Sequence, residues 1–155
     1  MSKQHHYSLS INWTGNRGSG TSGYRAYERE HTMSIERKAD VLLSSDPAFQ
    51  GDATRYNPEE LLLGSISSCH MLWYLHLCSD AGVIVTAYTD DPKGTMEESA
   101  SGGGRFTEVV LHPLVTVSDA SMIEKATELH EEANEKCFIA QSCNFPIRHQ
   151  PKIVV

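Results

Sequence analysis

One capped, apolar segment near the middle of the chain limits the possible folds most, because it predicts a single long helix. Asn57 is a favoured N-cap residue, Pro58 suits the first helical position, and Glu60 completes a capping box with Asn57. Gly82 is a suitable residue to end the helix. The helix predicted over 58–81 is about 36 Å long and carries apolar residues on almost every face. We therefore expect burial on several sides, with a second subunit covering part of the helix.

The residues before this helix predict short strands. Residues 7–13, "YSLSINW", alternate apolar and polar side chains, which is typical of a half-buried strand. A loop rich in Gly and Ser follows, and alternation resumes over 24–30, "YRAYERE", which we predict to pair back on the first strand. Residues 32–36, "TMSIE", predict a third short strand. Residues 44–58 form a polar connector rich in turn residues.

After the helix the chain predicts more strands and a second helix. Residues 83–88 indicate a buried strand, 95–98 its hairpin partner, and 105–117 a strand broken at Pro113. The glycines at 102–104 indicate a turn, because no GK[ST] follows them as a phosphate loop requires. Ser118 is expected to cap a helix over 119–136, and the sequence from 147 onward predicts a strand. The order of elements indicates an α+β fold in a single domain, 1–155, with no βαβ alternation.

Composition excludes some classes of function. The net charge is −7 and no Lys/Arg cluster is present, so we expect no nucleic-acid partner. The first ten residues lack the apolar stretch of a signal peptide, and no run approaches the roughly 20 apolar residues of a membrane span. We therefore expect a soluble cytoplasmic protein with no membrane partner.

The four cysteines are Cys69, Cys78, Cys137 and Cys143, with no CxxC spacing among them. Helical geometry places Trp73 and His76 on the face of Cys69, in a mostly apolar setting that raises the pKa of a thiol. A reactive Cys69 therefore needs a nearby cation, and an arginine serves best because it stays charged when desolvated. His70 lies about 100° around the helix and is a poor partner.

Two segments resemble the cysteine signatures of the OsmC/Ohr family, the osmotically inducible and organic hydroperoxide resistance proteins. They are "NPEELLLGSISSC" at 57–69 and "ANEKCFIAQS" at 133–142. The order of elements agrees from residue 7 to the end of the chain. The resemblance implies an OsmC-like fold, an intertwined α+β homodimer with two active sites near the subunit interface.

The resemblance also implies roles for individual residues. Cys69 would be the peroxidatic cysteine of a thiol-dependent peroxidase for organic hydroperoxides, and Cys137 the resolving cysteine. Glu59 would hydrogen-bond a catalytic arginine. Our choice for that arginine is Arg17, in the Gly-rich "GNRG"; the alternatives are Arg25 and Arg55.

Sequence features also indicate a less-studied branch of the family. OsmC-type members carry the catalytic arginine in the connector before the long helix, where this chain has Ala48. The residue pair "CH" at 69–70 and the segment "CFIA" at 137–140 indicate the same branch, so we expect its substrate to differ. The family implies a lipoyl-type or similar small dithiol as the reductant, and no cofactor.

Two alternatives remain open. The first is a metal site, for which soft ligands exist but at no standard zinc spacing; they are Cys69, His70, His76, Cys78, Cys137 and Cys143. The second is a non-enzymatic dimer that binds a small apolar ligand in the pocket around Cys69.

Overall fold

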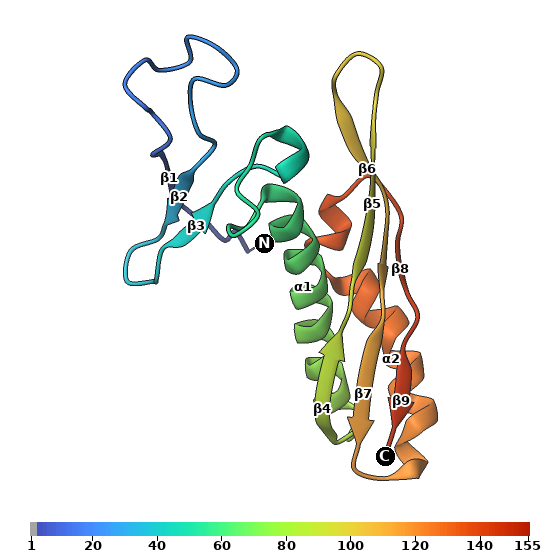
Figure 1. The fold of residues 1–155 in the computed structure, drawn as a ribbon. Helices are drawn as coiled ribbons and strands as arrows, with labels where there is room; N and C mark the ends of the chain where they lie inside the picture. The colour runs from blue at the N-terminus through green and yellow to red at the C-terminus, as the bar shows by residue number, and fades with distance from the viewer. Residues whose placement is uncertain (1–2) are drawn as a thin grey trace. The chain divides into compact units, whose positions relative to one another are not determined.

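A computed structural model describes residues 3–155, and the chain has the predicted α+β architecture. Its contacts cluster into two compact units, residues 1–61 and 62–155. Each unit is described by itself below (Figure 1). The assignment of 1–155 to one domain stays a prediction.

The N-terminal unit is built on a three-stranded antiparallel sheet in the order β1-β2-β3. Its strands are β1 (Ser10–Trp13), β2 (His31–Ser34) and β3 (Val41–Leu43), and the register places Trp13 opposite His31. A short 3-10 helix, η1 (Pro47–Phe49), follows, with Asp46 accepting a hydrogen bond from the Ala48 amide at 2.8 Å. The predictions of a first and a third short strand are confirmed.

The predicted strand over 24–30 is wrong for residues 24–27, which form turns and bends. The predicted pairing survives only at its end, where the Glu28 amide donates to the Gly15 carbonyl at 2.8 Å and the Thr14 amide donates to the Glu30 carbonyl at 2.9 Å. The Arg29 guanidinium donates hydrogen bonds to the carbonyls of Tyr27 and Tyr24, each at 2.6 Å. Those carbonyls are therefore not available to a strand ladder. The partner of β1 is instead β2. The alternating pattern misled because a side chain two to five residues away satisfied the backbone locally.

The sheet of the N-terminal unit leaves apolar side chains exposed in this chain. Leu9, Ile11 and Trp13 are 53%, 58% and 42% exposed, and every residue of β1 is exposed. The prediction that one face of residues 7–13 is buried is therefore wrong for the single chain. An exposed row of this kind is typical of a surface that another molecule covers.

The long helix is α1 (Pro58–Asp80), within one residue of the predicted bounds. Its capping box is present: the Glu60 amide donates to Asn57 Oδ1 at 2.8 Å, and the Asn57 amide donates to Glu60 Oε2 at 3.0 Å. Gly82, with φ +74°, ends it, and the Val83 amide donates to the Cys78 carbonyl at 2.8 Å. The sequence-based prediction of all three features is confirmed.

Only one face of α1 is buried in this chain, at Ile66, His70, Tyr74, Leu77 and Cys78. Leu72, on another face, is 61% exposed. Within residues 3–155, α1 is the one helix long and apolar enough to cross a membrane by length and composition. Central helices of soluble proteins share that property. Burial on several sides, as predicted, does not occur within the single chain.

The C-terminal unit contains two three-stranded sheets, ordered β4-β7-β9 and β5-β6-β8. Each strand of one sheet continues into a strand of the other along the chain (Figure 1). The strands are β4 (Val85–Asp90), β5 (Lys93–Glu98), β6 (Gly104–Leu111), β7 (Pro113–Val117), β8 (Ile147–His149) and β9 (Lys152–Val154). The pairs β4–β7 and β5–β6 are antiparallel, whereas β8 and β9 run parallel to β6 and β7. The predicted hairpin of 83–88 with 95–98 is therefore wrong, because β4 and β5 pair with other strands.

Three prolines explain why these strands divide into two sheets. Pro92, Pro113 and Pro151 each lie at or beside the junction of two consecutive strands. Proline has no amide hydrogen and cannot donate to a ladder, so pairing is interrupted at the same level in all three strands. The predicted break at Pro113 is confirmed, and the structure shows that it belongs to a row.

Asp90 bridges the row of prolines to the helix. Its Oδ1 accepts a hydrogen bond from the His112 amide at 2.7 Å, and its Oδ2 accepts one from the Ser67 hydroxyl at 2.5 Å. A carboxylate thus accepts the hydrogen bond of an amide that lies where the sheet is interrupted. The same side chain therefore fixes the position of α1, along the helix axis, relative to β4 and β7.

The second helix is preceded by a 3-10 turn, η2 (Ala120–Met122), and α2 itself covers Ile123–Lys136. Asp119, not the predicted Ser118, caps this region by accepting a hydrogen bond from the Ser121 amide at 2.8 Å. The Ser118 hydroxyl points instead to the Met122 sulfur. A third 3-10 turn, η3 (Ala140–Ser142), follows α2.

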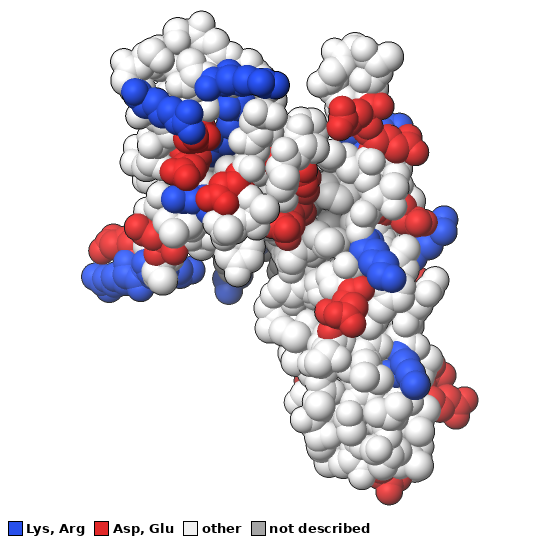
Figure 2. Space-filling model, viewed as in Figure 1, with Lys and Arg blue, Asp and Glu red and all other residues white. Residues whose placement is uncertain are grey.

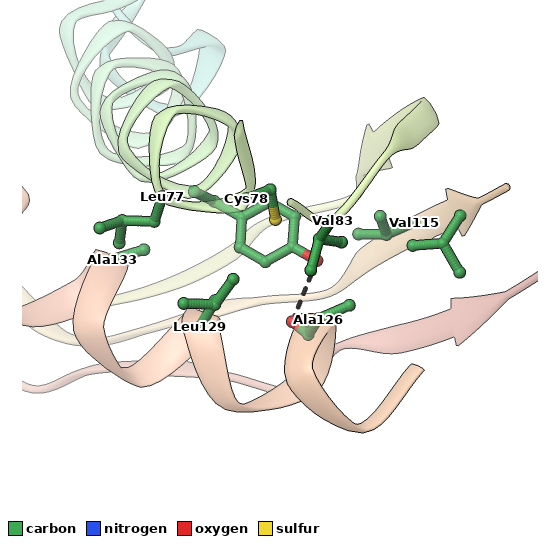
Figure 3. Close-up of a cluster of buried hydrophobic side chains, with 9 residues drawn as sticks. Leu77, Cys78, Val83, Val115, Ala126, Leu129 and Ala133 are labelled. Atoms are coloured by element: carbon green, nitrogen blue, oxygen red, sulfur yellow. Dashed lines mark hydrogen bonds between the residues drawn. The ribbon is translucent and has the colours of Figure 1, made fainter. Parts of the chain in front are cut away.

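The core of the C-terminal unit lies between the two helices and β7. Leu77 and Cys78 of α1 face Leu129 and Ala133 of α2, with Val115 beside them (Figure 3). A smaller cluster packs Ile66 of α1 against Val109 and Leu111 of β6. Both clusters hold α1 along the sheet and against α2.

Charges of both signs are interspersed on the face of each unit shown in Figure 2. Several charges are paired: Lys125 with Glu128, Lys136 with Glu132, and Arg148 with Glu108. This face therefore carries no extended stretch of one sign.

Candidate active site

Two cysteines from different helices meet in the C-terminal unit. Cys69 lies in the middle of α1 and is half-buried. Cys137 follows the last residue of α2, where the backbone turns from helical to extended, and its side chain is fully buried. Helix α2 was predicted to end at residue 136, and it does.

The Cys69 side chain is close enough to the Cys137 thiol to affect its protonation. Burial, first, and the neighbouring Cys69 thiol, second, raise the pKa of Cys137 to about 11. Both effects favour the protonated form, so Cys137 keeps its proton near neutral pH. The Ala140 amide also donates to the Cys137 Sγ at 3.4 Å. Both cysteines are free thiols in this structure.

Aromatic side chains surround the thiol pair on its outer side. Trp73, one turn after Cys69, meets Phe138 edge to face, with ring centroids 5.5 Å apart. Phe138 directly follows Cys137 and is 70% exposed. The Lys136 ammonium lies 6.0 Å from the Trp73 ring centroid. The expected aromatic setting of Cys69 is therefore present, and Phe138 adds an exposed ring that sequence reasoning did not single out.

Three histidines lie deeper between the helices and β8. His70 Nε2 and His130 Nδ1 are 2.9 Å apart, and both rings are almost fully buried. His149 stacks on both, with centroids 5.6 and 6.0 Å away, and the ring of Tyr74 stacks on His130 at 3.8 Å. Burial is the largest cause that lowers the pKa of His70 to about 4 and that of His130 to about 3.

His70 and His130 are therefore neutral near pH 7 and join the two helices rather than carry charge. His70 Nδ1 and His130 Nε2 have no hydrogen-bond partner among the described residues. Imidazoles with such low pKa values are too weakly basic to take a proton from a thiol at neutral pH. The prediction that His70 is a poor partner for Cys69 agrees with this chemistry, although no sequence pattern indicated the cluster.

The predicted catalytic arginine, Arg17, lies in the N-terminal unit. It follows Asn16, whose Oδ1 accepts hydrogen bonds from the Gly18 and Gly20 amides at 2.8 and 3.1 Å. Arg17 forms an ion pair with Glu28, and its side chain is 59% exposed. The Gly-rich turn predicted around it is present.

The remaining predicted residues of that unit have contacts of their own. Arg55 pairs with Glu30 at 3.5 Å and with Asp52 at 3.6 Å. Arg25 is exposed and has no ion pair among the described residues. Glu59 has one buried carboxylate oxygen, Oε2, with no hydrogen-bond partner among the described residues. A buried carboxylate without a partner is costly and favours a cation beside it.

The other two cysteines take no part in the thiol pair. Cys78 is buried in the core against Tyr74, and burial raises its pKa. The Cys143 thiol donates to the Ile139 carbonyl at 3.3 Å. Within residues 3–155, no group of three or more His, Cys, Asp or Glu side chains is arranged to hold a metal ion.

Comparison with known protein families gives a match to the family described as OsmC-like protein, over residues 51–152. The match includes both Cys69 and Cys137. No curated protein matches the chain.

Several solved structures are similar along almost the whole chain. An OsmC-like protein of unknown function from Vibrio cholerae is 26% identical, with a TM-score of 0.85 over 96% of this chain and 100% of that one. An organic hydroperoxide resistance protein from Elizabethkingia anophelis is 18% identical, with a TM-score of 0.68 over 98% and 99% of the two chains. One from Legionella pneumophila, described as a predicted redox protein, is 14% identical, with a TM-score of 0.68 over 98% and 100%.

Proposed function

Because this chain belongs to the OsmC-like protein family, we propose that it is a thiol-dependent peroxidase for organic hydroperoxides. The observation that carries the proposal is the proximity of the Cys69 and Cys137 side chains, which the fold brings together from two helices. The names of the structural neighbours from Elizabethkingia and Legionella also support it, since both are organic hydroperoxide resistance proteins.

The first step oxidises Cys69. Its thiolate attacks the outer oxygen of the hydroperoxide, the O–O bond breaks, and the alkoxide leaves as the alcohol after taking a proton. Cys69 becomes a sulfenic acid, having lost two electrons to the peroxide. The aromatic rings of Trp73 and Phe138 offer an apolar surface to the organic group, which favours alkyl and aryl hydroperoxides over hydrogen peroxide.

The second step resolves the sulfenic acid. The Cys137 sulfur attacks the Cys69 sulfur, a disulfide forms, and the hydroxyl group leaves as water with the proton that Cys137 gives up. A small dithiol of the lipoyl type then restores both thiols by two exchange reactions and is itself oxidised to a disulfide. Recycling of this kind needs a reducing compartment, so a cytoplasmic location is part of the proposal.

Arg17 and Glu59 complete the proposed machinery. A guanidinium stabilises the Cys69 thiolate, and Glu59, whose Oε2 lacks a partner, orients that guanidinium. In this structure Arg17 is paired with Glu28. The proposal therefore requires Arg17 to exchange Glu28 for Glu59 in the reactive state.

A homodimer is also part of the proposal. The exposed Leu9 and Ile11 of the N-terminal unit and the exposed Leu72 of α1 are surfaces of the kind that a second copy covers. We expect sedimentation velocity to give twice the mass of one chain at micromolar concentration. A single species with the mass of one chain would contradict this part.

Stopped-flow consumption of cumene hydroperoxide tests the chemistry. We expect Cys69→Ser to abolish the fast phase and Cys143→Ser, a matched control, to keep it. Cys137→Ser should complete one turnover and stop as a sulfenic acid, which mass spectrometry of a trapped adduct detects. Equal rates for wild type and Cys69→Ser would refute the peroxidase.

A comparison of two arginine variants tests the role of Arg17. We expect Arg17→Ala to slow the fast phase on the order of a hundredfold, as the loss of one electrostatic contact to a reacting group does. Arg25→Ala should leave it unchanged, since Arg25 is exposed. Equal effects of the two changes would remove Arg17 from the mechanism without affecting the roles of the cysteines.

A further inference from the structure

The N-terminal unit contains a pocket that the proposed chemistry does not use. Its volume is about 350 Å³, and its wall is almost entirely apolar. Trp13, Tyr27, Arg29 and His31 line it, together with Ser44 and Pro58. At roughly 30 Å³ per water, the pocket has room for about ten non-hydrogen atoms, which is the low end for small-molecule sites.

Arg29 is fixed in position at this pocket. Its guanidinium lies over the rings of Tyr24 and Tyr27, 4.4 and 4.3 Å from their centroids. Nη1 donates to the Tyr27 carbonyl and Nη2 to the Tyr24 carbonyl, both at 2.6 Å. Two rings and two carbonyls therefore hold the planar group, so a ligand that binds it does not bear the entropic cost of ordering it.

The charge of Arg29 has no counterpart in the described part of the chain. Its neighbours Glu28 and Glu30 are paired with Arg17 and Arg55, and no carboxylate lies within ion-pair distance of Arg29. Three of its five N–H donors have no hydrogen-bond partner among the described residues. Arg29 is one of the residues that line the pocket, and a guanidinium with free donors matches a carboxylate, which it binds through two parallel hydrogen bonds.

The aromatic wall is suited to the rest of such a ligand. Trp13 and Tyr27 meet edge to face at 5.8 Å, and the Trp13 indole N–H already donates to the Glu28 carbonyl at 2.8 Å. The indole therefore has no donor left for a polar ligand, and it offers a ring face. His31 Nδ1 is likewise occupied, because it lies 2.8 Å from the Arg29 carbonyl.

We propose that this pocket binds a small amphipathic carboxylate, with Arg29 holding the carboxylate and Trp13 and Tyr27 holding the apolar group. The lining of the pocket belongs to the N-terminal unit alone, and this proposal does not rest on the peroxidase proposal. Its class of ligand is a medium-chain or aryl-alkyl carboxylic acid of about ten non-hydrogen atoms.

Trp13 can report binding directly, because the chain has only two tryptophans. In a Trp73→Phe background the emission comes from Trp13 alone. We titrate this protein with octanoate, which has ten non-hydrogen atoms, and with 1-octanol as the neutral probe of similar size. We expect a saturable change with octanoate and an affinity at least tenfold lower for octanol, because only the carboxylate pairs with Arg29.

Three variants in this background locate the ligand. Arg29→Gln should weaken octanoate at least tenfold, and Arg25→Gln, an exposed arginine of the same segment, should not. Thr21 also lines the pocket. Thr21→Phe fills the pocket and leaves Arg29 in place, so it should abolish binding even if Arg29→Gln disturbs the local turns. If Thr21→Phe has the thermal midpoint of the parent protein, its loss of octanoate binding is not a failure to fold.

The opposite results would overturn the proposal. They are a linear response to octanoate, equal affinities for octanoate and octanol, or equal losses with Arg29→Gln and Arg25→Gln. Sedimentation of Arg29→Gln gives one more result that would overturn it. If this variant changes oligomeric state and wild type binds no octanoate, Arg29 pairs with a carboxylate of a second copy of the chain and not with a ligand.

Discussion

Cys137 is the residue whose protonation state controls the second step of the proposed reaction. It lies in a fully buried position with a pKa raised to about 11, so at pH 8 roughly one molecule in a thousand carries its thiolate. A buried thiol of this kind stays protonated until its partner sulfur is oxidised. Its attack then becomes favourable because the proton leaves with the hydroxyl group of the sulfenic acid.

This gives a prediction about selective labelling. Native reduced protein treated with iodoacetamide at pH 8 should be alkylated at the half-buried Cys69 before the buried Cys137. Peptide mass mapping over a time course measures both sites. In denaturant the two should react alike, which is the control. Labelling of Cys137 first would show that it, and not Cys69, is the accessible nucleophile.

At the scale of elements, α1 and α2 are joined through histidines that must stay neutral. The pKa of His70 falls from its usual value near 6.5 to about 4, and that of His130 to about 3. In the unfolded chain both bind protons once the pH drops below about 6.5. The folded state does not, so stability is full above that pH and is lost as the pH falls toward 4.

We therefore expect the free energy of unfolding to decrease by about 3 kcal/mol per histidine between pH 6.5 and 4. Urea unfolding across this range measures it. His130→Leu should flatten the slope, whereas His76→Gln, on the exposed side of α1, should keep it. A wild-type slope that matches His130→Leu would show that the pair does not stay neutral.

The hydrogen bonds of Asp90 beside the row of prolines give another prediction at the scale of elements. Asp90→Ala leaves the His112 amide and the Ser67 hydroxyl without their acceptor, so we expect a loss of about 1–3 kcal/mol of stability. Asp91→Ala is the matched control, because the neighbouring carboxylate is exposed and makes no side-chain hydrogen bond within the described chain. Thermal unfolding compares them. Equal thermal midpoints of the two variants would mean that water replaces the Asp90 carboxylate without a loss of stability.

The same scale shows what sequence could predict. Asn57, Glu60, Gly82 and Pro113 act within a few residues of themselves, so their effects could be predicted from spacing alone. The turns at 24–27 could not, because Arg29 satisfies carbonyls that a periodic pattern assigns to a strand. Asp119 replaced Ser118 as the cap, which is a competition between adjacent residues of similar capping strength.

The candidate site was predictable only in part. The resemblance, not the spacing, indicated that Cys69 and Cys137 meet, because the contact joins residues that are far apart in sequence. The histidine cluster was missed because His130 and His149 come from α2 and β8, and only tertiary packing brings them to His70. Phe138 was missed because no periodic pattern marks it.

For the whole molecule, oxidation should change global stability. A Cys69–Cys137 disulfide would close a loop that contains half of α1, both hairpins and α2. Chain-entropy estimates for a loop of that length give about 4 kcal/mol. We expect one equivalent of cumene hydroperoxide to raise the urea midpoint of wild type and leave Cys69→Ser unchanged. An unshifted midpoint, with the disulfide present by mass spectrometry, would mean that the bond strains the fold.

The three aligned prolines also protect the molecule against misassembly. Every strand of the C-terminal unit is interrupted near the same level, and the outer strands β4 and β5 offer at most six paired residues each. An unfolded neighbour can therefore add only a short stretch of backbone before the template ends. The sheet is in this way a poor seed for amyloid growth, at the cost of a weaker ladder.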